Sequence, residues 1–216
     1  MAEQPDTALY GAWLVREPSG NWLALAADLA GCYATGASQA EALERLATAV
    51  PAYYVWLSQH DEYTPTIHSR IRIEALETHD LRPGGASAFF TADAEPVNDE
   101  DLDWLLAALD WAYDDFLAAS ARRPSNAESE ALLSRMAAAQ VALIAYATGA
   151  LAPDLPAGGA ARVEAARDAA LAMFRMTSAR QRKVTHEETG QRWSLRRGLR
   201  ESVLIVRRAT DDLARM

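Results

Sequence analysis

Cysteine is almost missing from this chain of 216 residues, and long apolar runs are missing altogether. Because Cys32 is the single cysteine, no disulfide can form within the chain. No apolar run reaches the roughly 18 to 20 residues that a bilayer span needs. The first residues also lack the basic and apolar regions of a signal peptide. The sequence therefore predicts a cytoplasmic protein with no membrane partner.

Lysine is equally scarce, with Lys183 as its single instance, and charge is divided unevenly along the chain. Residues 1–100 contain 15 Asp and Glu against 5 Arg, whereas residues 101–216 contain 15 against 16 basic residues. The net charge of −9 therefore arises in the first half. An acidic module repels a phosphate backbone, so we expect no nucleic-acid partner.

The first half has the pattern of a small sheet with one helix. Apolar and aromatic residues separated by turn residues predict four strands, at residues 9–17, 22–28, 32–35 and 69–77. A helix is predicted from Ser38 to about Gln59, because Ser38 and Glu41 have the spacing of a capping box. The predicted order is β-β-β-α-β. Residues 81–97 are rich in Pro, Gly and small acidic residues and are predicted to be a linker. The pair Phe89 and Phe90 within it is expected to pack in a groove between domains rather than to bind a ligand.

The second half predicts four long amphipathic helices. Their apolar stripes and stop signals place them at residues 98–121, 127–148, 160–188 and 190–216. Four such helices make an up-down four-helix bundle. The predicted fold class is therefore α+β, with a sheet domain at residues 1–80, a linker at 81–97 and a bundle at 98–216.

Residues 8–78 resemble the N-terminal module of the HicB-like antitoxin family. The resemblance is carried by Asp28, Leu29, Gly31, Cys32, Gly36, Ser38, Glu41 and Ala42. Members of that family neutralise a small toxin and often carry a DNA-binding segment, and no such segment is visible here. The resemblance implies a reused interaction module.

Residues 98–216 are similar to the DinB-like bundle family, which includes thiol-dependent transferases. The match is carried by Gly190, Trp193, Ser194, Arg196, Arg197, Leu199 and Arg200. The resemblance implies a divalent metal held by three histidines, one on the second bundle helix and an i, i+4 pair on the fourth. Residues four apart share a helix face, so two imidazoles could meet one ion.

The metal-ligand histidines are missing from the matching positions, which hold Arg135, Ile205 and Ala209. We therefore expect no metal, no cofactor and no catalytic residue of the family's kind. Arg135 is instead expected to pair with Glu201 across the old site. The predicted ligand-binding cleft consists of Arg135, Gln140, Trp193, Glu201, Ile205, Arg208 and Ala209.

Other candidate sites are disfavoured on chemical grounds. A substitute metal site could use His186, at the predicted end of the third helix, with Glu187 or Glu188 and Glu201, but a solvated helix end is the favoured interpretation. Cys32 has no basic neighbour in sequence to activate it, and His68 and His79 are expected to be surface histidines. An anion pocket formed by Arg200, Arg207 and Arg208 opposite Arg135 is less favoured than a solvated face balanced by acidic residues.

Three functions remain open from the sequence. The first is a non-catalytic binding or regulatory protein acting on an unknown small molecule or protein. The second is a thiol- or small-molecule transferase that works without the family's metal. The third is an antitoxin-like partner of a small basic toxin, to which the acidic module would be complementary. Bundles and small sheets with exposed edges both favour a homodimer.

Overall fold

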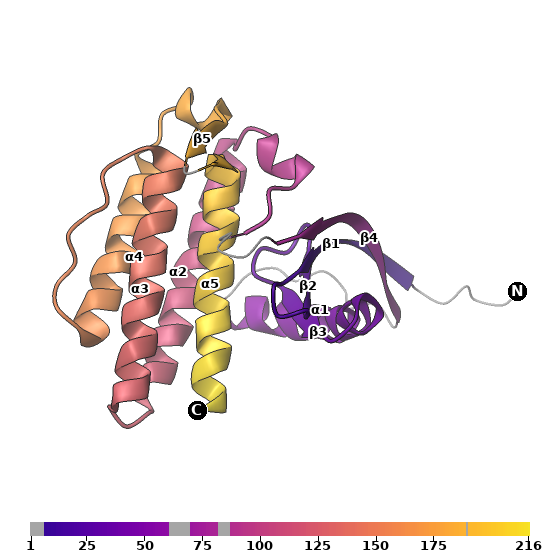
Figure 1. Cartoon of the computed structure of the whole chain (residues 1–216), viewed down its shortest axis with the longest axis horizontal. Helices are drawn as coiled ribbons and strands as arrows, with labels where there is room; N and C mark the ends of the chain where they lie inside the picture. The colour runs from indigo at the N-terminus through magenta and orange to yellow at the C-terminus, as the bar shows by residue number, and fades with distance from the viewer. Residues whose placement is uncertain (1–6, 61–69, 82–86, 189) are drawn as a thin grey trace, which may run out of the picture. The chain divides into compact units, whose positions relative to one another are not determined.

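The computed structural model describes residues 7–60, 70–81, 87–188 and 190–216. The chain is α+β and divides into two compact units, Met1–Phe90 and Thr91–Met216 (Figure 1). The first unit contains a four-stranded sheet with one helix, and the second contains a helical bundle. The predicted α+β class with a sheet domain followed by a bundle is confirmed.

The sheet of the first unit has the strand order β3-β2-β1-β4. Its strands are β1 (Thr7–Arg16), β2 (Trp22–Ala26), β3 (Tyr33–Gly36) and β4 (Arg70–Asp80). The first three pair antiparallel, whereas β4 returns parallel to β1. A helix between β3 and β4 supplies the crossover that a parallel pairing needs. The predicted start of the last strand, Ser69, lies outside the described residues, and β4 continues three residues beyond its predicted end at Glu77.

Helix α1 (Gln39–Gln59) begins where its capping residues predict. The Ser38 hydroxyl accepts a hydrogen bond from the Glu41 amide at 3.2 Å, and the Glu41 carboxylate accepts one from the Ala37 amide at 2.7 Å. A Cβ at Gly36 would lie 2.6 Å from the Ala42 nitrogen, so a glycine is needed where β3 leads into α1. The buried face of α1 packs on β2 and β3 and closes the core on one side of the sheet.

The segment predicted as a linker is packed chain over much of its described length. Phe90 is fully buried within the first unit and stacks on Trp13, with 4.8 Å between the ring centroids. The next residues form a short 3-10 helix, η1 (Thr91–Ala94), in which Asp93 is fully buried. Residues 82–86 lie outside the described part. Composition alone does not reveal single buried anchors such as Phe90 and Asp93 among small residues.

The second unit is built from four helices, α2 (Asp99–Ala121), α3 (Ala127–Thr148), α4 (Gly159–Arg175) and α5 (Leu195–Arg215). Helices α2 and α3 each pack mainly on α4 and α5. Asn98 and Asn126 cap α2 and α3 through their side-chain oxygens, and Gly149 ends α3 in the left-handed region with φ at 69°. Local signals of this kind explain why the bounds of α3 agree with the predicted range.

The third bundle helix is shorter than predicted, and this is a correction. Helix α4 ends at Arg175 and is followed by η2 (Gln181–Lys183) and a hairpin of β5 (His186–Glu188) and β6 (Gln191–Trp193). The apolar stripe of α4 ends at Phe174, and the residues after it are mostly polar. Without an apolar face, the chain has little reason to continue as a packed helix. Helix α5 correspondingly begins at Leu195 rather than near Gly190.

Helix α3 is the one described helix long and apolar enough, by length and composition, to cross a membrane. Within the bundle, 44 % of its most apolar stretch is buried. The core helix of a bundle passes the same test, so this finding assigns no membrane segment.

Candidate functional site

The first half of α5 presents a cluster of charged side chains inside the bundle. Arg200 and Glu201 follow Arg197 by three and four positions along the helix, so both lie on the same side of the helix as Arg197. They are 1 %, 7 % and 5 % exposed, and Asp93 of η1, which joins them, is 0 % exposed. We call these four residues the α5 cluster. Its two cations and two anions balance, which is the condition under which buried charges are tolerated.

Arg200 lies at the centre of the α5 cluster, between two carboxylates. Its Nε and Nη2 donate to the two carboxylate oxygens of Asp93 at 3.0 and 2.7 Å, in the two-pronged geometry that arginine favours. Its Nη1 donates to Glu201 Oε1 at 2.6 Å. Burial acts to lower the pKa of Arg200, but Glu201 and Asp93 outweigh it and hold the pKa above its ordinary value. Asp93 thereby fastens η1 to α5.

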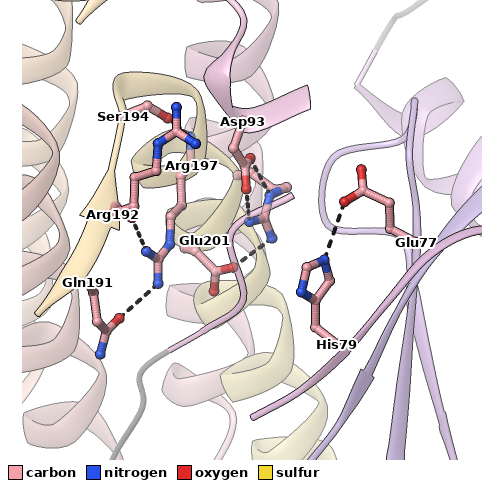
Figure 2. A network of polar contacts seen from close by, with 9 residues as sticks. Glu77, His79, Asp93, Gln191, Arg192, Ser194, Arg197 and Glu201 are labelled. Atoms are coloured by element: carbon pink, nitrogen blue, oxygen red, sulfur yellow. Dashed lines mark hydrogen bonds and ion pairs between the residues drawn. The ribbon is translucent and has the colours of Figure 1, made fainter. Parts of the chain in front are cut away.

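Arg197 attaches the β5–β6 hairpin to α5. Its guanidinium carbon lies 3.9 Å from the centre of the Trp193 ring, in cation–π geometry. The same group donates to Gln191 Oε1 at 2.9 Å and to the backbone carbonyl of Arg192 (Figure 2). Burial lowers the pKa of Arg197, yet an arginine stays protonated at any ordinary pH. These contacts commit Arg197 to holding the hairpin.

Three residues of the predicted cleft are buried inside the bundle. Gln140 is 0 % exposed, and its amide donates to the Ser202 hydroxyl at 2.7 Å, which links α3 to α5. Trp193 is also fully buried and packs on Tyr146, with 5.0 Å between the ring centroids. Glu201 belongs to the α5 cluster. The sequence thus selected buried residues but missed Ser202, which accepts from Gln140, and Asp93, which binds Arg200 beside Glu201.

Arg135 does not enter the bundle, which corrects the expected pair with Glu201. Arg135 is exposed on α3, whereas Glu201 pairs with Arg200. Helix α3 turns Leu133, Met136 and Gln140 inward, and position 135 falls outside that stripe.

The other predicted cleft residues lie further along α5. Ile205 and Arg208 are half-buried, and Ala209 is 5 % exposed. The anion pocket considered from sequence is not assembled as proposed, because Arg200 is already bound by Asp93 and Glu201 and Arg135 is exposed.

The histidines that the structure describes do not converge on a metal position. His186 lies on β5, not at a helix end, and its Nε2 is 2.7 Å from the Tyr146 carbonyl oxygen. Glu187 and Glu188 beside it are exposed, whereas Glu201 is buried. Among residues 7–60, 70–81, 87–188 and 190–216, no group of three His, Cys, Asp or Glu could hold a metal ion. The side chains at positions 135, 205 and 209 also do not fit a divalent ion, because arginine, isoleucine and alanine offer it no ligand atom.

The first unit holds the other two described candidates. His79 pairs with Glu77 at 3.3 Å (Figure 2). Its ring also lies nearly perpendicular to that of Phe90, with 5.2 Å between the ring centroids. Cys32 is buried, 3 % exposed, as a structural cysteine would be. His68 lies outside the residues that the structure describes.

Comparison with known proteins adds no relative: no family model, no curated protein and no solved structure matches this chain. The class of protein is therefore defined by the fold and the α5 cluster alone. It is an α+β protein with a sheet unit and a helical bundle that contains buried ion pairs.

A buried tyrosine yields a first prediction about the bundle. Tyr113 of α2 is 0 % exposed, and its hydroxyl has no hydrogen-bond partner within the described parts of the chain. Tyr113→Phe removes a hydroxyl that loses its hydrogen bonds to water on folding and gains none within the described parts of the chain. The variant is therefore expected to be more stable, with a free energy of unfolding about 1 kcal/mol above that of the wild type in urea denaturation at pH 7.

The same burial predicts a response to alkali. Burial raises the pKa of Tyr113, and Arg167 offsets this only in part. Above about pH 10 the unfolded chain loses the tyrosine proton while the folded chain keeps it, so stability falls as pH rises. The advantage of Tyr113→Phe should therefore grow above pH 10. A variant less stable than the wild type at both pH values would contradict this account.

Proposed function

We propose that the protein is a non-catalytic binding or regulatory protein in which the bundle serves as a scaffold. The observation that carries the proposal is that the buried charged side chains at the start of α5 are bound to partners inside the bundle rather than open to a substrate. Arg200 engages Asp93 and Glu201, and Gln140 engages Ser202. The carboxylates of Asp93 and Glu201 are thus engaged by a guanidinium inside the bundle rather than presented to a substrate.

The resemblance to DinB-like transferases supports a bundle retained for its shape. Where that family implies three histidines, this chain has an exposed arginine and two apolar residues. The transferase alternative places Arg135, Gln140, Trp193 and Glu201 near one cleft. Arg135 is exposed, and Glu201 is paired elsewhere, so the arrangement favours binding over transfer.

The charge distribution favours a second candidate, an antitoxin-like partner of a small basic protein. The 15 acidic residues against 5 arginines in the first 100 residues form a field that attracts a basic partner. The resemblance to HicB-like modules supports the same candidate. Binding a basic partner is also one way in which a non-catalytic regulatory protein could act.

Metal analysis tests the scaffold proposal. The full chain, produced with zinc and nickel in the medium, is expected to contain well under one metal ion per chain. Its melting temperature is expected to be unchanged by a chelator, because no set of ligands in the bundle needs an ion to fold.

A matched variant makes this test sharper. His186 is the single histidine in the bundle unit, so His186→Ala removes the one imidazole available to a metal there. Stoichiometric metal in the wild type that is lost in His186→Ala would establish a metal centre in the bundle and overturn the scaffold proposal.

A further inference from the structure

Strand β4 is exposed to a degree that the rest of its sheet is not. It forms one edge of the sheet and pairs with β1 on one side (Figure 1). None of its 11 residues is buried, although four of them are Ile, Ala or Leu. In contrast, the run from Ala12 to Val15 in β1 is buried throughout. Leu76 of β4 is 56 % exposed.

The outer edge of β4 is an unused pairing surface. No strand that the structure describes pairs with that edge, so its outward amides and carbonyls are available to another strand. Proteins usually keep such edges short or cover them. The opposite edge strand, β3, has only four residues, whereas β4 has 11.

A bulge limits the regular part of this edge. Ala12 pairs with Ala75, but Trp13 pairs with Glu77, so Leu76 is an extra residue. Leu76 lies over Gly11, where an added Cβ would come within 2.5 Å of it. A bulge bends its strand and interrupts pairing. The stretch that can accept a new strand is therefore Arg70–Ala75.

The side chains of this stretch alternate between the two faces of the sheet. Ile73 is paired with Tyr10, whose hydroxyl bonds to Tyr54 of α1, so Ile71 and Ile73 lie on the helix-covered face. Arg72 and Glu74 lie on the other face. Both are exposed, and neither forms an ion pair within the described residues.

We propose that β4 pairs antiparallel with β4 of a second copy of this chain, centred on Ile73. In that register Arg72 lies opposite Glu74 of the second copy, and Glu74 lies opposite Arg72 of the second copy. Ile71 then faces Ala75 of the second copy, and Ile73 meets its own equivalent. The two sheets join into one of eight strands across a two-fold axis.

The charge order along the strand selects a second copy as the occupant. A positive residue followed by a negative one, two positions later and on the same face, is complementary to itself when the strand is reversed. Opposite charges directly across an antiparallel pair stabilise it, and like charges destabilise it. Dimerisation through β4 is independent of the scaffold role proposed for the bundle. The first is measured by sedimentation and the second by metal analysis.

Charge reversal in the full chain tests the pairing by equilibrium sedimentation. The wild type is expected to dimerise. Arg72→Glu and Glu74→Arg each place like charges opposite one another in both pairs, so each is expected to raise the dimer dissociation constant at least about tenfold. The double variant Arg72→Glu with Glu74→Arg restores opposite charges and is expected to return within about threefold of the wild type.

A matched control separates pairing from net charge. Arg16→Glu makes the same charge change as Arg72→Glu at an exposed residue at the end of β1, and it should leave dimerisation unchanged. Because Arg72 and Glu74 are exposed, all variants should keep the wild-type circular dichroism spectrum, and at concentrations too low for dimerisation they should also keep its melting temperature. A wild type that stays monomeric, so that the edge is open to a foreign strand instead, would overturn the proposal. So would a dimer that ignores both single reversals or that the double variant fails to restore.

Discussion

Asp93→Ala is expected to lower the free energy of unfolding by about 3–5 kcal/mol, the range for removing one partner of a buried ion pair. Asp93 is fully buried and accepts two hydrogen bonds from Arg200, which is itself only 7 % exposed. After the substitution the guanidinium stays buried beside Glu201, without the second carboxylate that balanced the cluster. The loss should appear in urea denaturation followed by circular dichroism at 222 nm, which reports the helices.

A half-buried ion pair on neighbouring elements provides the control for Asp93. Asp101 of α2 pairs with Arg196 of α5, and their side chains are 36 % and 23 % exposed. Asp101→Ala is expected to cost about 1 kcal/mol or less, because water screens such a pair. Equal losses for the two variants would show that burial does not govern the Asp93 contact.

A double replacement tests whether the cost of Asp93→Ala comes from the charge left behind. Asp93→Leu together with Arg200→Met replaces both charges with apolar groups. It should recover at least half of the stability lost in Asp93→Ala, since exchange of a buried pair for apolar side chains is often close to neutral.

Gly198→Ala is expected to destabilise the bundle by about 2–3 kcal/mol, through overpacking between helices. The sign is unusual, since an alanine in a helix interior normally stabilises it by roughly 0.5–1 kcal/mol relative to glycine. A Cβ at Gly198 would lie 2.2 Å from the Ala147 Cβ on α3, well inside any carbon–carbon contact distance. Thermal or urea denaturation of the full chain measures the effect.

The clash can be relieved from the other helix. Ala147→Gly alone should cost about 1 kcal/mol through lost helix propensity. Combined with Gly198→Ala it moves the methyl group from α3 to α5, so the double variant should be more stable than Gly198→Ala alone. A Gly198→Ala protein at least as stable as the wild type would show that α3 and α5 can separate freely at this point.

Local signals explain which parts of the fold could be predicted. Ser38 with Glu41, Asn98, Asn126 and Gly149 are capping or stop residues, and the helices that they bound occur as expected. The predicted third bundle helix is too long, because the polar residues after Phe174 contain no proline or glycine before Gly190 to mark the end of the helix. Its end is decided by the loss of an apolar face, a weaker signal than a proline or glycine.

The contacts of the α5 cluster and the bond between Gln140 and Ser202 depend on residues far apart in sequence. Asp93 and Arg200 are 107 positions apart, and Gln140 and Ser202 are 62 apart, so spacing along one helix cannot pair them. The predicted position of Arg135 was wrong because a family pattern gives only the matching position in the sequence. It does not show which face of α3 that position occupies once the metal ligand is lost. One usable signal was overlooked. Gly198 and Ser202, small residues four apart, mark the side of α5 that approaches α3 closely.

The position of α5 in the chain has a consequence for synthesis. Helices α2 and α3 both pack on α5, yet it is the last of the bundle helices to leave the ribosome. At about 5–20 residues per second, roughly 5 to 20 seconds separate the emergence of Asp93 from that of Arg200. During that interval Asp93 has no counter-ion from α5, and the faces of α2 and α3 that α5 will cover are open to chaperones or to aggregation. The bundle must therefore complete its folding late, after nearly all of its sequence has been made.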